Sequence, residues 1–355
     1  MNSKRFFITT VIETLLAVAI IGTLVIIVDP YFHYHKPLKG LKYALPNEEI
    51  YTNDGIIRNF DYDGVIIGSS MIRNYKNSKF DRLFGVKSIK IPYDGAPIER
   101  INRDMEKILS THPDVKYILR SVEEDTLLYI PGNIQPMWYP EYLYDNNIFN
   151  DYLYILNKRV IFSELKKVAK LTLKKQSDLD FDKYLNWEKF VDREKADPFK
   201  FYDRGKKDKE REPELSEDEI QRLDKYIEQN LLKIPKEYPD TKFIYFFAPY
   251  SILHWDRLYQ EGDIKKMIEV EKYTIEKILT CDNIELYGFY DNYDMITNMK
   301  NYRDQIHHYS NISDSILEWI HEGKHRLTKE NYMEYLNKNR EFYVNYDYDS
   351  IFNKK

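Results

Sequence analysis

Three residues from two distant parts of the sequence carry side chains suited to acyl transfer. Ser70 ends the stretch "VIIGSS", in which a short apolar run typical of a buried strand leads into small residues. Asp304 and His307 lie three residues apart in "NYRDQIHHYSNISDSILEWI", in a predicted loop just before a helix. A carboxylate that orients an imidazole, which in turn activates a hydroxyl, is the arrangement of a catalytic triad. The spacing therefore predicts Ser70 as nucleophile, His307 as base and Asp304 as the orienting group.

A regular alternation of strands and helices would bring these residues together. The predicted strands are Gly64–Gly68, Val86–Tyr93, Lys116–Val122, Thr241–Phe247 and Ile284–Phe289. The predicted helices are Gly95–Leu109, Glu217–Leu232, Asp263–Leu279 and Ile312–His321. This order predicts an α/β fold in which helices cover both faces of a mostly parallel sheet. Such folds place their sites at the carboxyl ends of the strands, where Ser70 and His307 would meet.

Simpler interpretations of the same residues stay open. Ser70 by itself would be a strand-end serine that caps a helix. His307 and His308 would be a surface pair. If one of them is the base, His307 fits the spacing, although His308 stays open as the alternative. A metal site would need a third ligand at a fitting spacing, and only His254 is at hand. We therefore expect no metal and no cofactor.

The order of these motifs resembles the SGNH (GDSL-type) hydrolase superfamily. "GSSM" after a strand matches its nucleophile block, and "DxxH" before the last helix matches its Asp–His block. "PYDGAP" resembles the second block, so the resemblance implies that the amides of Ser70 and Gly95 form an oxyanion hole. It also implies a three-layer, flavodoxin-like fold. "FFAPYSILHWD" looks like membrane-anchored members, which include the D-alanine transfer protein of teichoic-acid modification and the acyl-transfer proteins of alginate and cellulose acetylation.

One block departs from that pattern. The superfamily supplies an Asn to the oxyanion hole after the third strand, but this chain has Glu123, Glu124 and Asp125 there. An ionised carboxylate cannot donate a hydrogen bond, and loss of one oxyanion donor typically slows the reaction ~10²–10³-fold. Either another donor substitutes or turnover is slow. The acyl-transfer relatives often lack this Asn too, which favours transfer over free hydrolysis.

The N-terminus predicts a membrane location. Residues 6–28 are nearly all apolar, about the ~20 residues that cross a bilayer as a helix. Lys4 and Arg5 precede them, which favours a cytoplasmic N-terminus. An aromatic group (Tyr31, Phe32, Tyr34) follows, as suits the outer interface. We expect a single-pass anchor with the rest of the chain outside the cell membrane; a cleaved signal peptide is the alternative.

Composition limits the other classes. The net charge of −5 gives no basic bias, so we expect no nucleic-acid partner. The single cysteine, Cys281, excludes an intrachain disulfide framework. The 32 tyrosines suit surfaces that face sugars or a membrane interface, although a coding bias would also produce them.

The predicted organisation has seven segments. They are a cytoplasmic tail (1–5), the transmembrane anchor (6–28), a lead-in segment (29–61) that looks irregular from Tyr43 to Asp61, the first part of the core (62–126), an insertion (127–213), the second part of the core (214–322) and a charged helical tail (323–355). The insertion opens with an aromatic cluster that forms either its core or a stacking platform for sugar rings: Trp138, Tyr139, Tyr142 and Tyr144. Its basic helix "KRVIFSELKKVAKLTLKK" is either an ordinary surface helix or a contact for anionic lipid or polymer.

The expected function follows from the resemblance and the anchor together. It is a membrane-anchored, extracytoplasmic serine acyltransferase that O-acylates a cell-surface polysaccharide or teichoic acid, with acetyl or D-alanyl groups, through an acyl-serine. A membrane-bound O-acyltransferase is the implied partner. Two alternatives stay open: a surface carbohydrate esterase, and a catalytically inert assembly or binding protein with the same fold.

Overall fold

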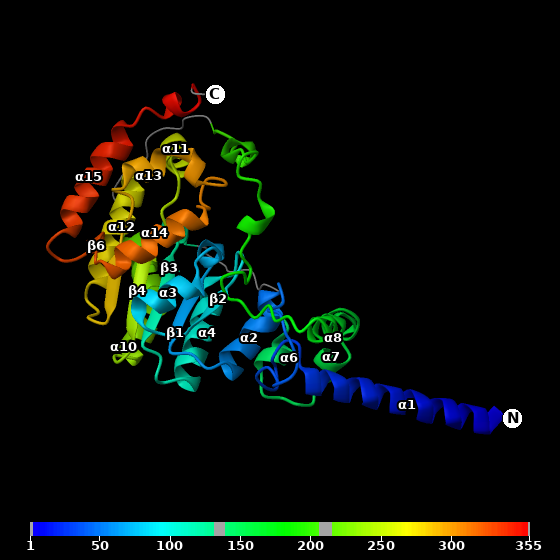
Figure 1. The fold of residues 1–355 in the computed structure, drawn as a ribbon. Helices are drawn as coiled ribbons and strands as arrows, with labels where there is room; N and C mark the ends of the chain where they lie inside the picture. The colour runs from blue at the N-terminus through cyan, green and yellow to red at the C-terminus, as the bar shows by residue number, and fades with distance from the viewer. Residues whose placement is uncertain (1–2, 131–138, 206–214, 354–355) are drawn as a thin grey trace. The chain divides into compact units, whose positions relative to one another are not determined.

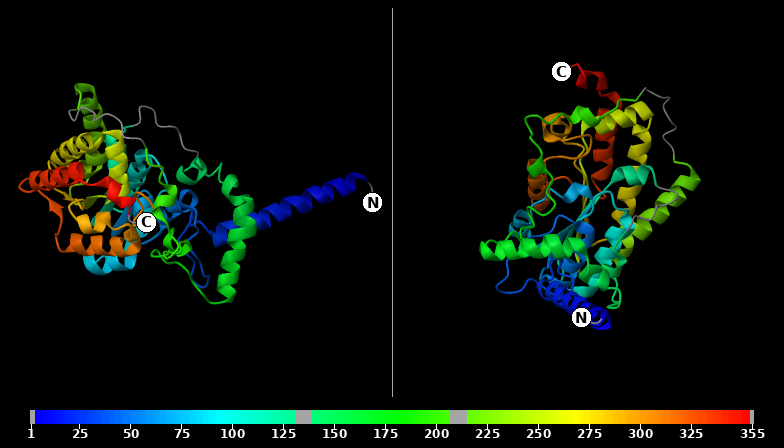
Figure 2. Two further views of the ribbon diagram at one scale, coloured as in Figure 1. Left: turned by 90° about the horizontal axis from the view of Figure 1, so that it is seen from above. Right: turned by 90° about the vertical axis from the view of Figure 1, so that its right-hand side faces the viewer.

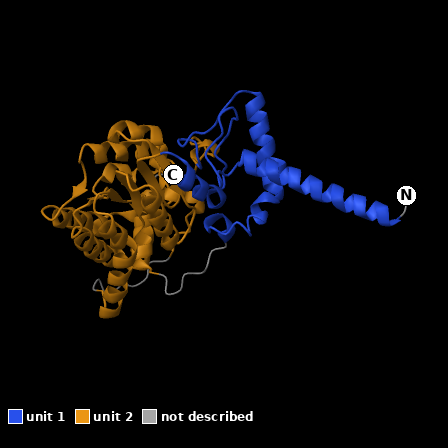
Figure 3. Ribbon diagram, turned by 90° about the horizontal axis from the view of Figure 1, so that it is seen from below, with its two compact units in different colours: residues 1–61, 137–185 blue, residues 62–136, 186–355 orange. Residues whose placement is uncertain are grey.

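The computed structural model describes residues 3–130, 139–205 and 215–353, which form two compact units (Figure 3). Unit 1 comprises residues 1–61 and 137–185, and unit 2 comprises residues 62–136 and 186–355. The middle part of the predicted insertion, residues 137–185, thus belongs with the lead-in segment, whereas its two ends belong with the sheet.

Unit 2 is built on a six-stranded sheet (Figure 1). Its strands are β1 (Gly64–Gly68), β2 (Ser88–Pro92), β3 (Tyr117–Val122), β4 (Lys242–Phe247), β5 (Ile284–Tyr287) and β6 (Arg326–Leu327). The order is β2-β1-β3-β4-β5-β6; the first five strands are parallel and β6 is antiparallel. Every residue of β1 and β2 is buried, so both faces of the sheet are covered. The predicted α/β class is confirmed.

The second and third strands of the chain lie on opposite sides of β1 in the sheet. β2 pairs with one edge of β1 and β3 with the other, so the strand order reverses at β1. Open α/β sheets bind ligands at such a switch point, outside the carboxyl ends of the strands. Ser70 follows β1 directly and therefore stands at this point.

Helices cover the sheet in packed pairs (Figures 1 and 2). They are α3 (Asn77–Phe84), α4 (Ile98–Thr111), α5 (Glu124–Leu128), α9 (Glu217–Ile227), which continues through a π-helical turn (Glu228–Leu232) into α10 (Lys233–Glu237), α11 (Ile252–Glu261), α12 (Ile264–Ile278), α13 (Tyr293–Thr297), α14 (Ser310–His321) and α15 (Tyr332–Asn345). α3 packs against α14, α4 against α10, and α12 against α15. α9 begins with a capping box formed by Ser216 and Glu219.

Several elements differ from the sequence-based expectation. α5, α11, α13 and β6 were not predicted, and the lead-in segment, expected to be irregular, contains α2 (Glu49–Asn59). The C-terminal tail, predicted to be charged and helical, has an apolar side: Tyr343 is fully buried and stacks on Trp255 with ring centroids 3.7 Å apart. Two of its tyrosines bury their rings and donate their hydroxyls to backbone carbonyls, Tyr343 to that of Tyr290 and Tyr348 to that of Tyr343. The C-terminal tail therefore contributes buried side chains to the core of unit 2, although its composition is polar.

Unit 1 combines a long N-terminal helix with short helices from two parts of the chain. They are α1 (Ser3–Val28), α2, α6 (Glu141–Tyr144), α7 (Tyr152–Ile155) and α8 (Leu165–Leu173), which follows a π-helical turn (Val160–Glu164). Val25, Tyr31, Leu143, Tyr154 and Val160 form its buried cluster. Gly55 in α2 is required by close approach, since a Cβ there would lie 2.2 Å from the carbonyl oxygen of Tyr31.

Among the described residues, α1 is the one helix long and apolar enough to cross a membrane. Most of its apolar side chains are exposed, Phe7 and Leu15 among them at 69% and 63%. A soluble protein would bury such a helix, so its exposure agrees with the predicted anchor.

Candidate active site

The turn after β1 separates the roles of two adjacent serines. Ser69 is the N-cap of a short 3₁₀ helix (Ser70–Ile72), and its hydroxyl accepts a hydrogen bond from the backbone N–H of Met71. Ser70 is the first residue inside that helix, so capping does not occupy its hydroxyl. Gly68 is needed because a Cβ there would lie 2.6 Å from Ser121 Oγ. The capping interpretation thus applies to Ser69 and leaves Ser70 available for chemistry.

Ser70 meets His307 across the sequence. Its Oγ lies 2.8 Å from His307 Nε2, although the two residues are 237 positions apart. Both side chains are partly exposed, so a substrate can reach them. The distance is that of a hydroxyl hydrogen-bonded to a base, as nucleophilic catalysis requires.

Asp304 holds the other side of the imidazole. His307 Nδ1 lies 2.9 Å from both carboxylate oxygens of Asp304, and the backbone N–H groups of Ile306 and His307 donate to Oδ1. Burial raises the pKa of Asp304, but the hydrogen bonds from His307 and the backbone outweigh it, so the pKa lies below its usual value. The carboxylate therefore stays ionised, and its contact with Nδ1 keeps a proton there. Nε2 is then free to accept the proton of Ser70.

His308 has a different environment. It is 3% exposed, and neither ring nitrogen has a hydrogen-bond partner in the part of the chain that the structure describes. Burial, with His307 nearby, lowers the pKa of His308 to about 3. A neutral, enclosed imidazole cannot exchange a proton with Ser70. The geometry thus distinguishes two histidines that the sequence left open.

Sequence reasoning missed Trp187, which packs against the catalytic imidazole. Its ring meets that of His307 edge-on, with centroids 6.0 Å apart, and the guanidinium of Arg303 lies 5.2 Å from its centroid. The next residue, Glu188, accepts the backbone N–H of Ser310 at 2.7 Å at the start of α14. These contacts fix the loop that carries Asp304 and His307. Trp187 lies in the predicted insertion, where no pattern linked it to the triad.

Glu123 follows β3, where the resemblance would place an Asn. Its Oε1 accepts hydrogen bonds of 2.7 Å from the hydroxyls of both Ser69 and Ser121. Burial raises the pKa of Glu123 more than these hydrogen bonds lower it. The carboxyl is thus held next to the nucleophile turn, in a setting that favours its neutral form.

Gly95 lies in the exposed loop after β2. Its φ of +58° is in the left-handed region, which suits glycine. The preceding residue, Asp94, forms an ion pair with Arg73, at the end of the 3₁₀ helix that begins with Ser70. The loop is therefore linked to the nucleophile turn, and the oxyanion role of the Gly95 amide stays a prediction.

The four residues predicted as a sugar platform belong to the second segment of unit 1, residues 137–185. Trp138 lies outside the described residues. Tyr139 is buried, its ring centroid lies 4.0 Å from that of Tyr144, and Tyr142 and Tyr144 pack against the buried cluster of unit 1. These contacts support the core interpretation, because they occupy much of the ring surface; a role in sugar binding stays a prediction.

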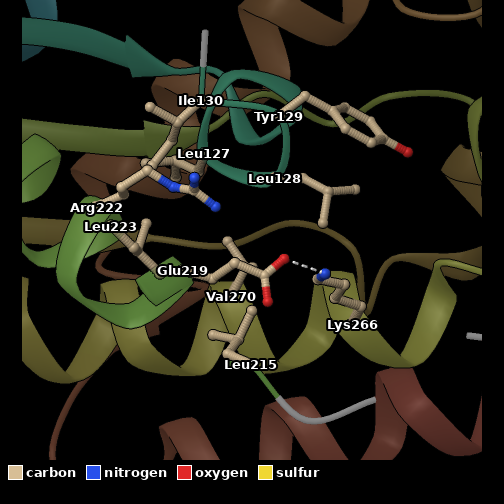
Figure 4. A pocket seen from close by; sticks show the side chains of 10 residues that line it. All are labelled: Leu127, Leu128, Tyr129, Ile130, Leu215, Glu219, Arg222, Leu223, Lys266 and Val270. Atoms are coloured by element: carbon tan, nitrogen blue, oxygen red, sulfur yellow. Dashed lines mark hydrogen bonds and ion pairs between the residues drawn. The ribbon is translucent and has the colours of Figure 1, made fainter. Parts of the chain in front are cut away.

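Unit 2 also has a pocket away from the triad, with a volume of about 100 Å³ (Figure 4). α5, α9 and α12 supply its lining, and an ion pair between Glu219 and Lys266 crosses it. Ser70, Asp304 and His307 are not part of this lining. The pocket therefore adds nothing to the acyl-transfer chemistry of the triad.

Comparisons with known protein families, with curated proteins and with solved structures find no match to this chain. The resemblance to the SGNH superfamily therefore stays a prediction, and the functional argument depends on the geometry of the site itself.

Proposed function

We propose that unit 2 is a serine acyl-transfer enzyme with Ser70 as its nucleophile. One observation carries this proposal: a continuous chain of contacts runs from Ser70 Oγ to His307 Nε2 at 2.8 Å and from His307 Nδ1 to Asp304 at 2.9 Å. The chain lies at the switch point of the sheet, and Asp304 is the member whose pKa is lowered. Nucleophile, base and orienting group then have the roles of a catalytic triad.

In the proposed mechanism, Ser70 Oγ attacks the carbonyl carbon of an acyl donor while His307 Nε2 takes its proton. The C–O bond to serine forms, and the tetrahedral oxyanion accepts hydrogen bonds from the amides of Ser70 and Gly95. His307 then returns its proton to the leaving group, which departs and leaves an acyl-serine. An acceptor hydroxyl, deprotonated by the same imidazole, then attacks the acyl-serine. The new ester forms as the bond from the carbonyl carbon to Ser70 Oγ breaks, and His307 returns the proton to Ser70 Oγ.

The acceptor we propose is a sugar hydroxyl of a cell-surface polysaccharide or teichoic acid, acylated with acetyl or D-alanyl groups. The exposed apolar helix α1 supports a membrane location, and Lys4 and Arg5 in its first turn favour a cytoplasmic N-terminus with the chain after α1 outside. A membrane-bound O-acyltransferase that passes the acyl group outward is the proposed partner. Water as the acceptor would make the same site a carbohydrate esterase.

A serine-reactive fluorophosphonate probe tests the nucleophile. We expect the full-length protein in detergent to be labelled, and the Ser70→Ala variant to lose labelling without a change in its thermal unfolding. Ser315→Ala is the matched control, because Ser315 lies on α14 in the same unit with its hydroxyl on the backbone of Asn311. Equal labelling of the wild type and Ser70→Ala would refute the assignment.

Two further assays separate the alternatives. If the protein is a transferase, cells that carry Ser70→Ala should leave the surface polymer unacylated at an unchanged protein level. The purified wild type should then hydrolyse p-nitrophenyl acetate poorly. Rapid, Ser70-dependent hydrolysis would identify an esterase. If neither polymer acylation nor hydrolysis depends on Ser70, the fold serves an assembly or binding role.

A further inference from the structure

The C-terminal turns of α1 are packed into unit 1. Val25 is fully buried in the cluster with Leu143, Tyr154 and Val160. Gly22 lies so close to α7 that an added Cβ would be 3.0 Å from Ile155 Cγ2. α1 also contacts α8 and the π-helical turn before it. The end of the helix therefore cannot enter a membrane without α7 lying beside it.

A buried polar cluster locks this arrangement. Asp29, the first residue after α1, is fully buried and accepts the hydroxyl of Tyr154 at 2.7 Å. The backbone N–H groups of His33, Tyr34 and His35 donate to the same carboxylate. One side chain thus binds the end of α1, the turn after it and α7 together.

The depth of α7 follows from the length of α1. If the apolar span starts at Phe6, after Arg5, Gly22 lies 16 residues further along, or roughly 24 Å at a rise of about 1.5 Å per residue. The hydrocarbon core of a bilayer is about 30 Å thick, so Gly22 lies several ångströms inside its outer boundary. Ile155, which packs on Gly22, then lies at the same depth.

The chain around α7 carries side chains suited to that depth. Six exposed apolar residues, here called the α7 surface, lie within 15 consecutive positions: Ile148 (74%), Phe149 (86%), Tyr152 (57%), Leu153 (43%), Leu156 (46%) and Phe162 (76%). Exposed cations follow or interleave them at Lys158, Arg159, Lys166, Lys167 and Lys170. Aromatic and aliphatic side chains next to lysines and arginines are typical of interfacial segments, whose cations reach the lipid head groups.

We propose that the α7 surface is inserted in the outer leaflet of the membrane, where it lies in lipid beside α1. Lipid is the occupant the observations favour, because the surface is continuous with α1 and the length of α1 places it at the depth of acyl chains. Unit 1 would then be fixed at the bilayer at two places instead of hanging from one helix. This inference depends on α1 crossing the membrane and not on the chemistry of Ser70.

Site-specific fluorescence tests the proposal on the full-length chain in lipid nanodiscs. In a Cys281→Ser background, Phe149→Cys and Phe162→Cys carry an environment-sensitive NBD label, in nanodiscs with or without doxyl-labelled lipid. We expect both protein-bound labels to emit at shorter wavelength than the free dye does in aqueous buffer. We also expect doxyl lipid to quench them strongly and aqueous iodide to quench them weakly. Lys183→Cys is the control, because this exposed residue of unit 1 should show the opposite pattern.

Two results would overturn the proposal. Iodide access without doxyl quenching at Phe149 and Phe162 would place the surface in water. Protection from both quenchers would show that protein, either a partner or a second copy, covers the surface. Unchanged thermal unfolding of each variant shows that the label has not disturbed the fold, and no outcome depends on enzymatic activity.

Discussion

Two groups of ionisable side chains follow neighbouring strands of the same sheet, and their environments are opposite. After β1, Ser70, His307 and Asp304 form one hydrogen-bonded chain and are partly exposed. After β3, Glu124 lies near Glu271 of α12, and both side chains are buried, each with 1% of its surface exposed. Residue types that do chemistry occur in both groups, but only the first group is exposed enough for a substrate to reach it.

The buried pair shows what burial does to the pKa of an acid. Burial raises the pKa of Glu271 to about 8, and burial together with Glu271 raises the pKa of Glu124 well above its usual value. Nearby His254 is equally buried, and burial lowers its pKa to about 4. These groups stay neutral in the folded protein at pH values where they would be charged in water. Strongly shifted pKa values therefore mark the structural group here, while the catalytic group is marked by its contacts.

The adjacent histidines give the largest expected contrast, because one belongs to the hydrogen-bonded chain and the other to the buried interior. We expect His307→Phe to slow fluorophosphonate labelling roughly 10²–10⁴-fold, since it removes the base that activates Ser70. His308→Phe keeps the ring volume and should label at nearly the wild-type rate. A similar loss in both variants would contradict the assignment of His307, and not His308, as the base.

His308→Phe should also change acid stability. The pKa of His308 is about 3 in the folded state and about 6.5 unfolded, so the unfolded chain binds the proton first as the pH falls. The contribution of His308 to stability is thus complete above about pH 6.5 and is lost toward pH 3. We expect the melting temperature of the variant to fall less steeply than that of the wild type over this range.

The buried acids give the next effect, on stability at alkaline pH. A carboxyl with a raised folded pKa contributes stability below its unfolded pKa of about 4.5, and this is lost as the pH rises through 8. The loss for Glu271 amounts to at most about 4 kcal/mol at pH 8. Glu271→Gln should therefore lose less melting temperature than the wild type between pH 5 and 8.5, and label normally with fluorophosphonate.

Glu276→Gln is the control for this experiment, because Glu276 is exposed on the same helix. It should follow the wild-type pH dependence. A Glu271→Gln profile that also follows the wild type would mean that Glu271 ionises freely in the folded protein.

The smallest expected effect is on the labelling rate of a Glu123 variant. Glu123 directly precedes Glu124 of the buried group and accepts the hydroxyl of Ser69, which is next to Ser70. An ionised Glu123 opposes the negative charge that develops on the carbonyl oxygen when Ser70 attacks. We expect Glu123→Gln to label faster than the wild type at pH 8, by up to about tenfold, as for an interaction of about 1.4 kcal/mol. The advantage should shrink as the pH falls through the raised pKa of Glu123, because the wild type then becomes neutral as well. A slower variant at every pH would show that the carboxylate itself is needed.

Local patterns predicted the elements that carry the triad. The apolar runs at β1 to β5 are strands within a few residues of the predicted bounds, because continuous burial needs continuous apolar sequence. α9 and α14 begin within a few residues of the predicted bounds. For α9, the capping box of Ser216 and Glu219 sets the start, since it depends only on neighbouring residues. α2 was missed because most of its buried residues, from Thr52 to Gly55, are small or polar and resemble a surface pattern. α15 lies in the tail that was predicted to be helical, but the burial of Tyr343 in it was not predicted.

The sequence by itself thus determined the alternation of strands and helices, the apolar N-terminal helix and the residue types of a serine site. Only the tertiary structure decided that Ser70 faces His307 rather than capping its own helix, that Trp187 packs on the imidazole, and that α7 lies beside α1. These are contacts between segments up to 237 residues apart, set by strand order and side-chain packing. Propensity and spacing act over a few residues, so they cannot specify which distant side chains meet.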